Sequence, residues 1–108
     1  MREGDFVWLL VMFDLPNVTD GEKRAHTVFR NGLLRRGFTR LQWSVYARGY
    51  ASEKACVPDR GALEVAVPPG GRVRMLVVTD LQFGRMVCVD GGRRREPEKK
   101  LEQIVMIE

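Results

Sequence analysis

Asp14 is the residue whose type and place could do chemistry, because its carboxylate directly follows the apolar run at residues 6–13. Carboxylate oxygens are ligands for a hard cation such as Mg²⁺, and a bound cation can activate water for phosphodiester hydrolysis. One carboxylate is a poor metal site by itself, but a symmetric dimer would supply two across its axis. The alternative is that Asp14 caps the turn before Pro16.

The charge of the chain is consistent with a polyanionic partner. It has 18 Lys and Arg against 14 Asp and Glu, a net charge of +4, and Arg outnumbers Lys. Guanidinium groups make bidentate contacts with phosphate. A generic solvated surface explains the same balance, and both interpretations apply to the basic cluster near the C-terminal end. That cluster consists of Arg93, Arg94, Arg95, Lys99 and Lys100.

Several classes of protein are excluded by the composition. Cys56 and Cys88 are the only cysteines and His26 is the only histidine, so one chain cannot build a Cys/His zinc site. No apolar run reaches the roughly 18 residues that a membrane span needs. We see no signal peptide and expect reduced thiols and a cytoplasmic protein. A chain of 108 residues predicts one core, with a site on a surface or in a cleft completed by a second subunit.

Hydrophobic periodicity predicts alternating strands and helices. Thr19 and Glu22 match a capping box, which begins a helix that extends to about Arg36 and ends at Gly37. The predicted strands are residues 6–13, 38–48, 72–80 and a short 82–89; a weaker helix spans 52–66, residues 90–100 form a polar loop or hinge, and 103–107 form a C-terminal strand.

Two of the predicted strands carry further expectations. The strand at 6–13 is apolar on both faces, so it needs a layer on each side, and a partner subunit is the simplest source of the second layer. The strand at 38–48 alternates, with one face inward and one face polar. The predicted inward face is Leu41, Trp43, Val45 and Ala47, and the other face is Arg40, Gln42, Ser44 and Tyr46.

These elements predict an α+β fold. We favour a ferredoxin-like βαββαβ arrangement, an antiparallel sheet with two helices on one face, plus a short C-terminal strand. Residues 1–90 would form this domain. Residues 91–108 would form a charged hinge and a strand that docks on a partner chain.

The first half of the chain resembles the CRISPR-associated Cas-two family, in a form similar to its type II branch. The residues that carry the resemblance are MFDLP at 12–16, the helix with Lys23 and Arg24, GF at 37–38 and RLQWSVYAR at 40–48, with a looser likeness through the third strand and the ending QIVMIE. The resemblance implies a ferredoxin-like twofold dimer with packed sheet faces. It also implies a partnership with the Cas-one integrase on duplex DNA during spacer acquisition, and in some members a metal-dependent nuclease activity on RNA or DNA.

The resemblance also implies roles for individual residues. Asp14 matches the strand-end aspartate and would bind Mg²⁺ or Mn²⁺. Arg40 and Tyr46 match an arginine and an aromatic near the site, and Ser44 would hydrogen-bond near the metal or across the dimer; a half-polar dimer face is the alternative for Ser44. Lys23 and Arg24 match only approximately, and would contact phosphate or lie on a solvated helix face.

Two functions follow from this resemblance. The first is a metal-dependent endonuclease with Asp14, Arg40, Ser44 and Tyr46 as catalytic residues. The second is a purely architectural adaptor that binds nucleic acid beside the integrase. Nucleic acid would contact Lys23, Arg24, Arg40, Arg93, Arg94 and Arg95 in either case.

Overall fold

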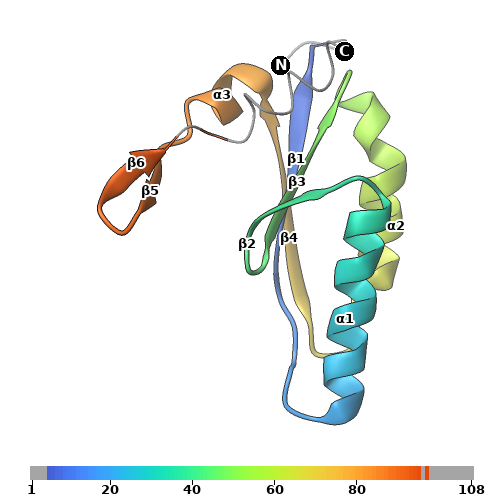
Figure 1. The fold of residues 1–108 in the computed structure, drawn as a ribbon. Helices are drawn as coiled ribbons and strands as arrows, with labels where there is room; N and C mark the ends of the chain where they lie inside the picture. Colours follow the sequence, from blue (N-terminus) through green and yellow to red (C-terminus); the bar gives the residue numbers. More distant parts are fainter. Residues whose placement is uncertain (1–4, 96, 98–108) are drawn as a thin grey trace.

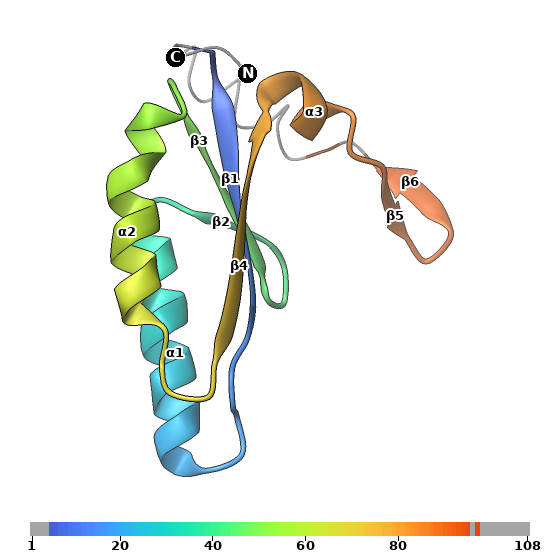
Figure 2. The ribbon, with the colours of Figure 1, turned by 180° about the vertical axis from the view of Figure 1, so that it is seen from behind.

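The computed structural model describes residues 5–95 and 97. Its main sheet has four antiparallel strands in the order β2-β3-β1-β4. Figures 1 and 2 show α1 and α2 side by side on one face of this sheet. The elements are β1 Val7–Asp14, α1 Asp20–Arg35, β2 Thr39–Gln42, β3 Val45–Tyr50, a 3₁₀ turn η1 Lys54–Cys56, α2 Val57–Ala66, β4 Arg72–Thr79, α3 Asp80–Gly84, β5 Cys88–Asp90 and β6 Arg93–Arg95. The ferredoxin-like α+β prediction is confirmed.

The main core lies between the sheet and the two long helices. Alternate residues of β1 face this layer and pack against α1 and α2. Thr19 starts α1 as predicted, since its Oγ1 accepts a hydrogen bond from the Glu22 backbone N–H at 3.1 Å, and Glu22 accepts one from the Thr19 N–H at 2.9 Å. The residues that line the core are Val7, Leu9, Val11, Phe13, Leu15, Phe29, Leu33, Phe38, Tyr46, Tyr50, Cys56 and Leu63.

The prediction of one strand at residues 38–48 is wrong. The chain turns at Trp43 and Ser44, and β2 pairs back on β3, with a register shift between Arg40 and Gln42. The turn contains no glycine or proline, so the polar–apolar alternation continues through it and hides it. The predicted faces are wrong at two residues, because Tyr46 is fully buried in the main core and Trp43 is 59% exposed. Ala47, on the predicted inward face, is 1% exposed, and Leu41 packs against the cluster that contains it.

A short helix supplies part of the second layer that we assigned to a partner subunit. Trp8 faces away from α1 and α2, and its ring stacks on Phe83 of α3 at 4.2 Å. The Trp8 indole N–H donates to Asp80 Oδ1 at 2.9 Å. The predicted strand at 82–89 is therefore wrong over its first half, where α3 forms instead. Thr79 and Gln82 make a capping box, a signal that the sequence analysis recognised only at Thr19.

The basic segment is a hairpin rather than a loop. Strands β5 and β6 pair around a turn at Gly91 and Gly92, both of which have positive φ values, 58° and 90°, that favour glycine. Figure 1 shows the hairpin projecting from the α3 end of the sheet. The predicted strand at 103–107 lies outside the described residues, and the division into domains at residue 90 stays a prediction. Among the described helices, none is long and apolar enough to cross a membrane.

Candidate functional site

Asp14 is the last residue of β1 and its side chain is exposed. The preceding residue, Phe13, packs into the main core, so the alternation of the strand points Asp14 to the opposite face of the sheet. This face is not covered by α1 or α2, and we call it the open face. It carries Trp8, Leu10, Met12 and Asp14 on β1, and Arg72, Arg74, Leu76 and Val78 on β4. The predicted strand-end position of the carboxylate is confirmed.

Two arginines that the sequence analysis missed lie beside Asp14. Arg72 is its direct partner in the β1–β4 ladder, and Arg74 is the partner of Met12. Both side chains are exposed. Directly opposed residues in an antiparallel pair have Cβ atoms roughly 5 Å apart, so Arg72 places a cation next to the carboxylate. The alternation Arg72, Val73, Arg74 was the available signal, because it puts both arginines on one face of the strand.

Arg40 and Tyr46 do not share the face of Asp14. They pair with each other across β2 and β3, and Tyr46 pairs with Val11 on the helix-covered side. The Tyr46 ring stacks on Phe13 at 5.7 Å, and its buried hydroxyl has no hydrogen-bond partner among the described residues. The sheet backbone therefore separates this pair from the Asp14 carboxylate.

Ser44 lies beside the end of β1. Its backbone carbonyl accepts a hydrogen bond from the Phe13 N–H at 3.0 Å. This bond holds the β2–β3 turn against the strand end that carries Asp14. A role for the Ser44 hydroxyl stays a prediction.

The remaining predicted nucleic-acid residues are divided between two ends of the sheet. Lys23 and Arg24 are exposed in α1, which begins just after the Asp14 end of β1. Arg93, Arg94 and Arg95 belong to β6, beyond α3, which follows the strand end paired with Val7. Arg95 Nε lies 2.8 Å from Asp90 Oδ2 in the same hairpin. One chain therefore does not bring the β6 arginines to Asp14.

A part-buried ionic cluster at Asp59 has a structural role and was not predicted. Arg36 and Arg48 bind the Asp59 carboxylate at 3.0 and 2.6 Å, and the Tyr50 hydroxyl donates to it at 2.6 Å. Burial raises the pKa of Tyr50, and the hydrogen bond to Asp59 raises it further. Burial also acts to raise the pKa of Asp59, but the Tyr50 hydrogen bond and the two arginines outweigh burial and lower it. The cluster ties the end of α1 to β3 and α2.

The donor set that the described residues of one chain bring together does not fit a resident metal. No group of three His, Cys, Asp or Glu side chains gathers within the part of the chain that the structure describes. Asp14 contributes one carboxylate, and its cross-strand neighbour is an arginine. A metal at this position needs oxygen ligands from a second molecule.

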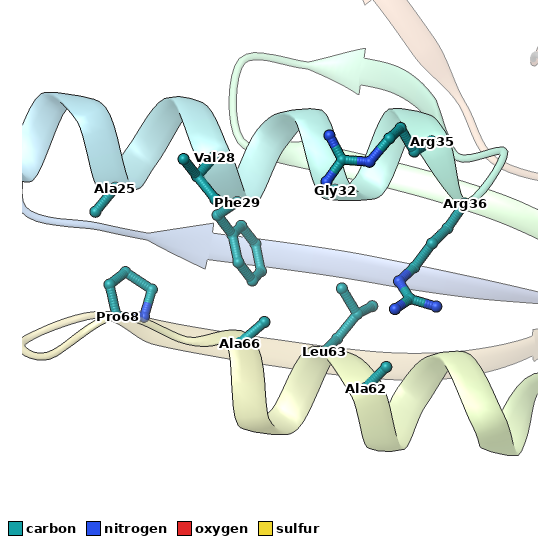
Figure 3. Close-up of a pocket in the computed structure, with 10 residues that line it drawn as sticks. All are labelled: Ala25, Val28, Phe29, Gly32, Arg35, Arg36, Ala62, Leu63, Ala66 and Pro68. Atoms are coloured by element: carbon teal, nitrogen blue, oxygen red, sulfur yellow. The ribbon is translucent and has the colours of Figure 1, made fainter.

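A groove of about 510 Å³ lies between α1 and α2, as Figure 3 shows. Its lining is mostly apolar, with Arg35 and Arg36 at one end. It contains no carboxylate, thiol or hydroxyl side chain, so it offers no nucleophile or metal ligand. The open face with Asp14 is the better candidate site.

Comparisons with known proteins identify the family. The family model of CRISPR associated protein Cas2 matches residues 7–86, from β1 to just after α3. A relative from Parvibaculum lavamentivorans is 42% identical over 91 residues, covering 84% of this chain and 89% of its own. A relative from Paracidovorax avenae is 42% identical over 94 residues, covering 87% of this chain and 86% of its own. A relative from Flavobacterium psychrophilum is 34% identical over 98 residues, covering 91% of this chain and 85% of its own.

All three relatives are named CRISPR-associated endoribonuclease Cas2. The matched region contains Asp14, the four-stranded sheet and both long helices. The resemblance found at residues 12–48 thus extends over most of the described fold. The chain belongs to the Cas2 family of CRISPR-associated proteins.

Proposed function

We propose that this chain is a CRISPR-associated endoribonuclease whose site forms around Asp14 on the open face of the sheet. The observation that carries the proposal is the exposed Asp14 carboxylate with Arg72 directly opposite it. An arginine beside the carboxylate can bind the phosphate of a substrate, which a lone aspartate would repel. The names of the relatives support an RNA substrate.

The proposed active form is a homodimer joined through the open faces. Leu76 is 52% exposed at the centre of β4, next to Leu10 on β1. A second copy would bury these side chains and would bring two copies of Asp14 toward a twofold axis. The dimer therefore explains why β1 is apolar on the open face as well, where α3 covers only part of the strand.

Two Asp14 carboxylates from two chains could hold one Mg²⁺ or Mn²⁺ ion, whereas the described residues of one chain bring only one carboxylate to the site. Such an ion, when bound, would supply an electrophile for the phosphate and an activated water. Arg72 would hold the phosphate in place. Arg40 would contact the RNA farther along, while Tyr46 would support Phe13 beneath the site. This assigns Tyr46 a packing role in place of the catalytic role expected from the resemblance.

A second candidate function is the architectural adaptor, which would bind duplex DNA together with the Cas-one integrase. The lack of a three-ligand cluster among the described residues favours it, as do the basic residues at both ends of the sheet. An adaptor needs no catalytic carboxylate. Its binding to duplex DNA should weaken steeply with salt, because phosphate contacts release counterions.

The two functions separate in one cleavage assay. Wild type and the Asp14→Asn variant are incubated with single-stranded RNA and Mg²⁺, with Glu64→Gln, an exposed carboxylate on α2, as the matched control. The nuclease proposal predicts that only Asp14→Asn loses cleavage, by about a hundredfold or more. Equal rates in all three proteins would contradict it and would favour the adaptor.

A further inference from the structure

Trp43 is an exposed aromatic side chain at the end of the sheet that carries Asp14. It lies in the β2–β3 turn and is 59% exposed, whereas the other tryptophan, Trp8, is 2% exposed beneath α3. The neighbouring residue, Ser44, is hydrogen-bonded to the Phe13 N–H. The indole is therefore fixed next to the strand end of Asp14.

Cationic and aromatic groups surround the indole. The Arg40 guanidinium carbon lies 5.1 Å from the Trp43 ring centroid, and the His26 ring lies 6.0 Å away at an interplanar angle of 21°. The His26 ring also lies 6.0 Å from the Phe13 ring, which supports it from the core side. Both contacts leave most of the Trp43 surface open, as its exposed fraction shows.

The adjacent face of α1 adds further positive charge. Lys23 and Arg30 lie three residues before and four residues after His26, so all three follow one side of the helix. No carboxylate forms an ion pair with Lys23, Arg30 or Arg40 within the described residues. Arg30 Nε is buried and has no hydrogen-bond partner there. An exposed indole thus lies beside cations that form no ion pair with any carboxylate the structure describes.

We infer that Trp43 is a stacking platform for an unpaired base of single-stranded RNA, and that Lys23, Arg30 and Arg40 bind the flanking phosphates. The inference rests on the proposed nuclease function and names the residues that would bind its RNA. An indole face binds any unpaired base, and adjacent cations bind the backbone. In a duplex the bases are paired and stacked on each other, so they are not accessible to the indole. Trp43 contacts His26 of α1 on the helix-covered side, so a chain stacked on Trp43 would cross the end of β1 to reach Asp14 on the open face.

Tryptophan fluorescence tests the contact in the unmodified protein. A short oligoadenylate RNA is titrated into wild type without divalent ions, so that binding is measured without cleavage. Stacking predicts quenching of Trp43, whereas the buried Trp8 retains its emission. A matched RNA duplex should bind through its phosphates without quenching. No quenching by oligoadenylate at saturation would overturn the inference.

The Trp43→Leu variant tests the energetic contribution. Its affinity for oligoadenylate should fall about five- to a hundredfold, the range for loss of one base–aromatic stack, while its affinity for the duplex stays the same. Trp43→Phe should retain most of the affinity, and Val65→Ala, an exposed apolar residue on α2, should retain all of it. Unchanged affinity in Trp43→Leu, or an equal loss for the duplex, would contradict stacking.

Two measurements distinguish a failure of the stacking inference from a failure of the nuclease proposal. Oligoadenylate should still quench Trp43 in Asp14→Asn, so a failure of cleavage leaves the stacking result intact. Conversely, a wild type that cleaves RNA without quenching would disprove stacking and retain the nuclease. If Trp43→Leu instead changes the sedimentation mass, the indole contacts another protein chain and the inference is wrong.

Discussion

Asp14 and Arg72 lie directly opposite each other in the β1–β4 ladder, on the sheet face that α1 and α2 leave open. Both side chains are exposed. The carboxylate therefore has a cation next to it without being enclosed, and a phosphate can approach both groups from the open face. This pair defines the proposed site more closely than Asp14 alone.

We expect Arg72→Gln to slow RNA cleavage by about ten- to a hundredfold, because it removes one charge-assisted contact to phosphate. The loss should appear mainly in KM if Arg72 binds substrate and transition state equally, and in kcat if it acts on developing charge. Steady-state kinetics measures both. Arg60→Gln on α2 is the control, and an equal loss in that variant would show that net charge matters more than position.

The homodimer predicts a different effect for Leu76→Asp. A carboxylate at the centre of the open face would oppose its own copy across the axis and would stay desolvated there. Sedimentation at micromolar concentration should give the mass of one chain for Leu76→Asp and of two chains for wild type. Val65→Asp, on the exposed face of α2, should remain dimeric. A monomeric wild type would remove the second carboxylate and, with it, the proposed metal site.

The Asp59 cluster predicts a dependence of stability on pH. The pKa of Asp59 is lowered in the folded protein, so its contribution to the free energy of unfolding is complete above the unfolded value, about 4, and is lost as pH falls through the lower folded pKa. Asp59→Asn should cost about 1–2 kcal/mol at neutral pH, since Arg36 and Arg48 lose their partner but are themselves part-exposed.

Urea unfolding of wild type and Asp59→Asn between pH 7 and pH 3 measures this contribution. The difference in free energy should stay constant down to about pH 5 and shrink below about pH 4. Glu64→Gln provides a baseline for the loss of an exposed carboxylate. A difference that is independent of pH would mean that the ionised form of Asp59 does not stabilise the fold.

The sequence predicted those features that depend on local patterns. The apolar strand before Asp14, the capping box at Thr19 and the second long helix are local signals, and each is present in the structure. The turn at Trp43 was missed because its residues continue the alternation of the strands on both sides. The error placed Trp43 in the core and Tyr46 on a polar face, the reverse of what the structure shows.

The rest of the candidate site depends on pairing between distant strands. Arg72 becomes a neighbour of Asp14 only through the β1–β4 register, and the resemblance did not point to it. The same register separates Arg40 and Tyr46 from the open face. Local periodicity gives the face of a residue within its strand, but not which strand lies beside it.

The proposed active site is shared by two chains, and mixing wild type with Asp14→Asn tests this directly. After subunit exchange at equal concentrations, about a quarter of the dimers contain two Asp14 carboxylates. If both are needed, cleavage should fall to about a quarter of that of the same total concentration of wild type. A fall to about one half would show that each chain acts alone and would contradict the shared site.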